Sequence, residues 1–203
     1  MGDRELNHDL LLQGSETQLR IVSPSSRFID QMDFSFQCTY CHEVHEGSPS
    51  FGFTAPDPYV ALSEEQKQSI ASLTDNLCVI HYENGTVDRF VRAVLEVPIH
   101  GIDRPFLWGI WVSASEQSFD RYVATFDDPI EGDGFFGWVS NRIPEYPVES
   151  MRSGDVYIQI GQQRPKVLLH QPKQEVDQLF IDQREGISVD RAQFLTEKLL
   201  HKL

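Results

Sequence analysis

The sequence predicts an α+β fold, with a mainly antiparallel sheet, flanking helices and an N-terminal turn of the zinc-knuckle kind. Consecutive strand-like segments are joined by short turns, as in antiparallel hairpins. Segments with the apolar spacing of helices lie before, between and after these hairpins. Two cysteines separated by two residues, Cys38 and Cys41, lie at the start of the dense apolar pattern. These three observations together define the expected architecture.

The first half of the pattern predicts one helix and three strands. Ser63 and Gln66 have the spacing of a capping box at a helix start, and Asn84-Gly85 is a typical hairpin turn because both residues tolerate positive φ. The last strand is apolar on both faces, which suits a central strand, although periodicity alone also fits a buried helix. The expected elements are a helix over 62–73 and strands over 77–82, 91–97 and 106–112.

The second half predicts a further hairpin between helices. Ser115 and Ser188 stand where helix N-caps are expected, and Gly186 is placed to end a short helix. The expected elements are a helix over 115–126, a strand over 135–139, hairpin arms over 156–160 and 167–169, and helices over 176–184 and 188–203.

Chain length and composition indicate one globular domain over residues 32–203. The 203-residue chain is long enough for a sizeable core. Residues 1–31 are polar and rich in breakers, which is typical of a flexible leader. Met32 stands directly before the apolar pattern, so a native start at either Met1 or Met32 fits the sequence.

The charge balance narrows the classes of partner. The formal net charge is -14, from 31 acidic and 17 basic side chains. Such a surface repels phosphate backbones and anionic membranes, so neither nucleic acid nor a membrane is expected as a partner. A basic protein partner fits the charge, but the simpler interpretation is that the charge only keeps the protein soluble. A monomer or weak dimer is expected. The chain has no signal-peptide pattern and no apolar run of spanning length, so a cytoplasmic location is expected.

The segment from Cys38 to His45 has the spacing of a metal site. Two thiolates separated by two residues can bind one ion from a tight turn, and His45 can reach the same ion. Cys78 is the remaining cysteine and is the expected fourth ligand, while His42 is placed less well. The sequence therefore predicts structural zinc. The alternative is that Cys78 is simply a buried core residue.

A second group of residues forms a candidate binding rim. The charged stretch Asp182 to Glu185 and the tryptophans could line a polar or aromatic surface, although a solvated helix end and core packing explain them as well. No nucleophile elbow, phosphate-binding loop, dinucleotide fingerprint or zincin motif is present in the sequence. The candidate rim residues are Asp182, Arg184, Glu185, Trp108 and Trp138.

Several short motifs, in order, resemble one bacterial family that is catalogued only as a domain of unknown function, number 2199. The resemblance extends from about Phe34 to the C-terminus and implies a bacterial protein with one intact domain, but no activity. The motifs are Phe36-Gln37-Cys38-Thr39-Tyr40-Cys41 with His45, Leu77-Cys78-Val79-Ile80, Phe90-Val91-Arg92, Trp108-Gly109-Ile110-Trp111-Val112-Ser113, Gly137-Trp138 and Asp182-Gln183-Arg184-Glu185-Gly186-Ile187.

Two functional hypotheses follow from the sequence. The first is a non-catalytic binding or regulatory protein whose fold is stapled by zinc. The second is a metal-dependent enzyme in which Cys38, Cys41 and His45 hold zinc with one open position and Glu43 acts as a base. The first is favoured, because a short cysteine knuckle near the start of a domain is more often structural.

Overall fold

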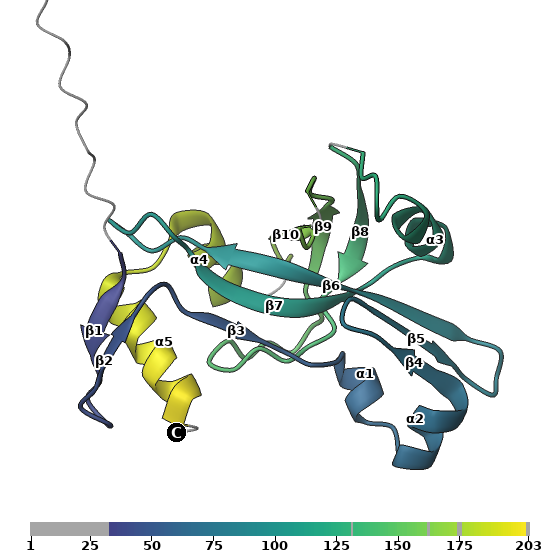
Figure 1. Cartoon of the computed structure of the whole chain (residues 1–203), viewed down its shortest axis with the longest axis horizontal. Helices are drawn as coiled ribbons and strands as arrows, with labels where there is room; N and C mark the ends of the chain where they lie inside the picture. The colour runs from purple at the N-terminus through teal and green to yellow at the C-terminus, as the bar shows by residue number, and fades with distance from the viewer. Residues whose placement is uncertain (1–32, 131, 162, 174–175, 202–203) are drawn as a thin grey trace, which may run out of the picture. The chain divides into compact units, whose positions relative to one another are not determined.

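A computed structural model describes residues 33–130, 132–161, 163–173 and 176–201 (Figure 1). Residues Gln31–Leu203 form one compact unit. The predicted leader and the choice between Met1 and Met32 lie outside the described residues.

The described residues contain five helices, a mixed eight-stranded sheet and a small two-stranded sheet. In chain order the elements are β1 (Ser35–Gln37), β2 (Val44–Glu46), β3 (Ser50–Gly52), α1 (Asp57–Val60), α2 (Glu64–Ile70), β4 (Ala71–Leu73), β5 (Leu77–His81), β6 (Val87–Val97), β7 (Phe106–Ser113), α3 (Glu116–Ala124), β8 (Gly134–Trp138), β9 (Ser153–Tyr157), β10 (Lys166–Leu169), α4 (Gln178–Glu185) and α5 (Val189–His201).

The α+β class is confirmed, and the large sheet is mixed: most of its strand pairs are antiparallel, as predicted, but not all of them. Its strand order is β3-β7-β6-β10-β9-β8, and β5 pairs with β6 and β4. Two neighbouring pairs are parallel, β3 with β7 and β10 with β6. Both parallel pairs join strands that are far apart in the chain. Short turns in the sequence reveal only the pairs between consecutive strands.

The residue after β8, Val139, forms an isolated antiparallel bridge with Val112, so the end of β8 lies against β7 (Figure 1). The Trp138 backbone N–H donates to Ser113 Oγ at 3.1 Å, and the Ser140 N–H donates to the Trp111 carbonyl at 2.7 Å. Gly137 has no side chain at this crossing, where a Cβ would lie 2.5 Å from the Ser113 carbonyl oxygen. The crossing therefore depends on glycine at this position.

Two apolar clusters cover the two faces of the central strands. The alternation predicted for 91–97 is confirmed, because Val91, Ala93, Leu95 and Val97 are buried in the main cluster. The smaller cluster lies on the other face and consists of Cys78, Ile80, Phe90 and Trp111. Strand β7 contributes to both clusters, which confirms that it is covered on both sides.

Local signals in the sequence place several boundaries correctly. The capping box of Ser63 and Gln66 is present, and Gly85 has the positive φ of 85° that the hairpin turn requires. The predicted helix over 62–73 ends earlier, at Ile70, because residues Ala71–Leu73 pair with β5 as β4. Pairing with a neighbouring strand thus overrides helix propensity at this end.

Among the described residues, none of the helices combines the length and apolar character needed to cross a membrane.

Candidate metal centre

Cys38 and Cys41 lie in the tight turn that joins β1 to β2. The Cys38 N–H donates to the Glu43 carbonyl at 2.8 Å, and the His42 N–H donates to the Cys38 carbonyl at 3.1 Å. His42 adopts a positive φ of 62°, which closes the turn. The Tyr40 N–H donates to Cys38 Sγ at 3.4 Å. The backbone is therefore arranged to present two sulfur atoms.

The hairpin itself supplies the third donor. His45 on β2 stands opposite Phe36 on β1, and the two rings stack with centroids 5.2 Å apart. This stacking fixes the imidazole so that its Nε2 lies 3.4 Å from Cys41 Sγ. The predicted association of Cys38, Cys41 and His45 is thus present in the structure.

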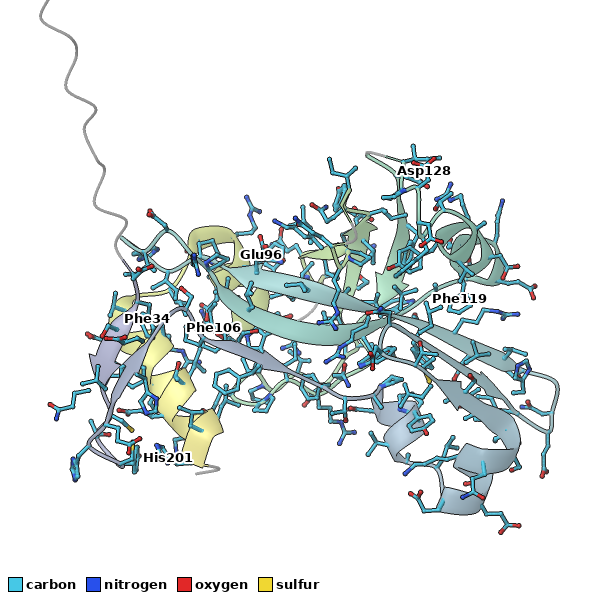
Figure 2. The ribbon with its side chains drawn as sticks, viewed as in Figure 1. Phe34, Glu96, Phe106, Phe119, Asp128 and His201 are labelled. Carbon is cyan, nitrogen blue, oxygen red and sulfur yellow. The ribbon has the colours of Figure 1, made fainter. Side chains whose placement is uncertain are left out.

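The fourth donor comes from the other end of the chain. His201 is the last residue of α5, and its Nε2 lies 3.1 Å from Cys38 Sγ. Figure 2 labels His201 at the end of α5, beside the turn that joins β1 and β2. The Tyr40 ring lies 5.5 Å from the imidazole of His201, centroid to centroid, and packs against it. Helix α5 therefore brings a C-terminal side chain to an N-terminal turn.

The geometry of the four donors suits a tetrahedral metal ion. The donor atoms of Cys38, Cys41, His45 and His201 all lie within 4.8 Å of one another. Around zinc, with bonds of about 2.3 Å to sulfur and about 2.0 Å to nitrogen, tetrahedral ligand atoms are separated by about 3.3–3.8 Å. The two sulfur–nitrogen distances of 3.1 and 3.4 Å need little adjustment to reach this arrangement. The cluster can therefore hold a metal ion.

Cys78, the ligand expected in the fourth position, lies elsewhere. It is fully buried in β5, within the apolar cluster around Phe90 and Trp111. Burial, together with the charge of Asp88, raises the pKa of its thiol to about 12. A thiol held neutral in an apolar core is a poor metal ligand, because metals bind the thiolate. The fourth member of the cluster is His201 and not Cys78.

Glu197 supports the cluster from one helical turn before His201. It accepts hydrogen bonds from the Thr39 N–H at 2.8 Å and from Thr39 Oγ1 at 3.0 Å. Burial opposes ionisation, but these hydrogen bonds, that from Gln193 and the charge of His201 outweigh it and lower the pKa of Glu197. An ionised carboxylate thus fastens the turn between the two cysteines to α5.

The candidate rim residues do not form one surface. Asp182 is buried and accepts a hydrogen bond from the Tyr146 hydroxyl at 2.8 Å, and Trp108 is buried in the main core. Arg184 is exposed, with its guanidinium over the Phe180 ring. Glu185 is also exposed, and Trp138 is 41% exposed on β8.

A protein-family model matches residues 37–187, which is more than half of the chain. Its description is "Uncharacterized protein conserved in bacteria (DUF2199)". The chain belongs to this family. The match confirms the resemblance found in the sequence, and it includes three of the four donors but ends before His201. Comparisons with curated proteins and with solved structures returned no match.

Sequence reasoning missed His201 because no local spacing links it to the cysteines. The only available signal was a histidine at the end of an amphipathic helix, and many such histidines are merely solvated. Its role depends on how α5 packs against the hairpin, which is a tertiary property.

Proposed function

We propose that Cys38, Cys41, His45 and His201 bind one structural zinc ion in a non-catalytic binding or regulatory protein. The observation that carries this proposal is the convergence of four donors of the Cys2His2 type within 4.8 Å. Closed sets of cysteine and histidine are typical of structural zinc sites. When bound, the ion supplies a cross-link between the two ends of the folded unit.

Such a cross-link stabilises the folded state. Strands β1 and β2 have three residues each and form their own small sheet, so they bring few hydrogen bonds of their own. Cys38 and His201 are 163 residues apart in the chain. Tying such distant residues together restricts the unfolded chain, which by loop-closure arguments stabilises the fold by up to about 5 kcal/mol.

The four donors favour a structural role over the alternative of a zinc enzyme. Catalytic zinc sites keep one position for water or substrate, with three protein ligands. With His201 as fourth donor, the expected open position of a Cys2His site is filled. The side chain of Glu43, considered as a base, belongs to an exposed residue of the turn. The observations thus support a structural zinc site more strongly than a catalytic one.

Metal analysis of the purified full chain tests the proposal. We expect elemental mass spectrometry to find one zinc ion per chain. The protein with cobalt in place of zinc should show the visible absorption spectrum of a tetrahedral thiolate site. Cys38→Ser and His201→Asn should each lower zinc occupancy strongly. Less than one tenth of a zinc per chain after purification without chelator and after zinc addition would contradict the proposal.

Matched variants distinguish the ligands from their neighbours. Cys78→Ala removes a cysteine that lies in the apolar core, and His42→Asn removes a histidine from the same turn while keeping a residue that tolerates positive φ. Both should retain one zinc per chain. Loss of zinc in either variant would show a different ligand set.

A further inference from the structure

A large pocket lies away from the metal cluster. It has a volume of about 1170 Å³ and is bounded by the loop of residues 139–152, the start of α1 and the part of β6 around Phe90. None of its lining residues is a donor of the metal cluster. The volume exceeds the range of about 300–1,000 Å³ that is usual for small-molecule sites and is sufficient for several side chains of a peptide.

Asn141 holds the first part of the loop in place. Its buried side chain accepts a hydrogen bond from the Trp111 N–H at 2.8 Å and donates to the Ala55 carbonyl at 3.0 Å and to Asp57 Oδ1 at 3.1 Å. Asp57 Oδ2 in turn accepts from the Arg142 N–H at 2.9 Å. One amide side chain thus joins the loop, β7 and α1, and it fixes one side of the pocket.

A buried ion pair holds the second part. Arg152 donates to Asp177 through Nε at 2.7 Å and through Nη2 at 3.0 Å, and its Nη2 also donates to the Tyr146 carbonyl at 2.7 Å. The Tyr146 hydroxyl donates to Asp182 on α4. Taking these charges out of water is costly, so the network serves more to hold one loop geometry than to add stability.

The loop between these anchors is shaped in advance. Glu145 adopts a positive φ of 64°, which is uncommon for a residue with a side chain, and it lies between Pro144 and Pro147. A long irregular loop held by buried polar groups is typical of binding loops rather than of simple connections. Because the pocket wall is preformed, a ligand need not order it, which favours affinity.

The lining combines apolar surface with an excess of carboxylates. Met151, which is 62% exposed, and Phe90, which is buried, both line the pocket. The lining includes the acidic side chains of Asp57, Asp88 and Glu145 and the arginines Arg142 and Arg152. The charge of Arg152 is balanced by Asp177, so the pocket is acidic. A ligand with cationic groups on an apolar body complements this surface.

We propose that this pocket binds a short segment of a partner protein that presents lysine or arginine beside apolar side chains. The excess of pocket carboxylates and the net charge of -14 attract such a segment, while Phe90, Met151 and their apolar neighbours accept its uncharged part. The proposal deepens the binding role proposed above by naming the surface and the class of partner, and it does not require the zinc ion.

The test is a nuclear magnetic resonance titration of the ¹⁵N-labelled full chain, with zinc content measured on the same sample. The probe is a capped six-residue peptide that alternates arginine and leucine. We expect saturable shifts of amide signals within residues 139–152 and around Asp88. A matched peptide with glutamine in place of arginine should bind at least fivefold more weakly. Equal affinity for the two peptides, shifts confined to other surfaces, or no binding would overturn the proposal.

Two variants and a control assign the charge effect to the pocket. Glu145→Gln and Asp88→Asn each remove one carboxylate, and each should raise the Kd for the arginine peptide about threefold. Asp103→Asn removes an exposed carboxylate after the opposite end of β6 and should leave the Kd unchanged. An equal effect of all three variants on the Kd would indicate that the net charge of the protein alone attracts the peptide, and it would overturn the proposal that the pocket binds it.

The proposed zinc site and the proposed peptide binding by the pocket can be refuted independently. Peptide binding by a protein without zinc would contradict the proposed staple and leave the pocket supported. A protein with one zinc per chain that binds no peptide would overturn only the proposal that the pocket binds a peptide.

Discussion

Glu197 on α5 accepts two hydrogen bonds from Thr39, one from its backbone N–H at 2.8 Å and one from its hydroxyl at 3.0 Å. Thr39 lies directly after Cys38, and Glu197 lies four residues before His201. Residues four apart share one face of a helix, so Glu197 and His201 reach the same turn together. The carboxylate thereby positions the turn and the helix for the four donors without being one of them.

Glu197→Ala should weaken zinc binding about tenfold, because residues that orient metal ligands commonly contribute between about 10-fold and 100-fold to affinity. Competition with a zinc-responsive chelator measures the change. Glu83→Gln, which removes an exposed carboxylate in the β5–β6 turn, is the matched control and should leave the affinity unchanged. An unchanged affinity in Glu197→Ala would mean that the hydrogen bonds to Thr39 do not position the ligands.

The three cysteines should differ in reactivity toward an alkylating reagent. Cys41 is exposed, whereas Cys78 is fully buried and has a pKa raised to about 12 by burial and by the charge of Asp88. In zinc-free folded protein near pH 8, we expect iodoacetamide to modify Cys41 first and Cys78 only after unfolding. Zinc should protect Cys41, as peptide mass mapping can show. Rapid modification of Cys78 in the folded chain would contradict the structure.

Part of the metal cluster could be predicted from sequence because its chemistry is local. Cys38, Cys41 and His45 lie in one turn, and their spacing alone brings their side chains together. The choice of Cys78 as the fourth ligand rested on composition rather than on geometry. Only the packing of α5 shows that His201 reaches the cysteines while the strand pairing of β5 buries Cys78 in the core.

The fold shows the same division between local and distant information. Capping residues and the Asn84-Gly85 turn marked α2 and the β5–β6 hairpin, because these signals depend on neighbours in the chain. The parallel pair of β3 with β7 has no turn to mark it, and the three residues of β3 are too few for a periodic pattern. The loop network around Arg152 and Asp177 is equally invisible, since its partners are distant in sequence.

The buried ion pair of Arg152 and Asp177 should make single substitutions costly. Asp177→Ala leaves the guanidinium without its partner in a buried site and should lower the free energy of unfolding by about 3–5 kcal/mol. Urea unfolding followed by tryptophan fluorescence measures this. Replacing both members, as in Arg152→Met with Asp177→Leu, should cost less than Asp177→Ala. If the double variant is the less stable of the two, the pair contributes net stability instead.

Gly137→Ala should destabilise the crossing of β8 with β7. A Cβ at this position would lie 2.5 Å from the Ser113 carbonyl oxygen and 3.4 Å from Val112 Cβ, so the strands would have to separate. Such overpacking typically costs about 1–3 kcal/mol. Phe136→Ala changes the neighbouring residue, whose side chain is half exposed, and should cost less. Thermal unfolding of both variants provides the comparison, and equal melting temperatures for Gly137→Ala and the parent would refute the close approach.

Stability should fall in alkaline solution, in part because of Cys78. Its folded pKa of about 12 lies above the ordinary value of 9.0, so the folded state retains a proton that the unfolded state loses. The stability from this group is therefore fully present below about pH 9 and is lost as the pH rises toward 12, by about 1 kcal/mol at pH 10. Tyr82 and Tyr122, with pKa values raised to about 12 mainly by burial, act in the same direction above about pH 10.

The variant Cys78→Ala isolates the contribution of the thiol. It should be less stable than the parent at pH 8, because it leaves a small cavity beside Phe90 and Trp111. Between pH 8 and pH 10, however, it should lose about 1 kcal/mol less than the parent, since it has no thiol to ionise on unfolding. The contributions of Tyr122 and the metal cluster are common to both proteins and cancel in this difference, which urea unfolding at the two pH values measures. Tyr82, whose pKa is raised mainly by burial and only in its last contribution by Cys78, adds little to the difference. Equal losses would mean that Cys78 titrates normally and is not sealed in the core.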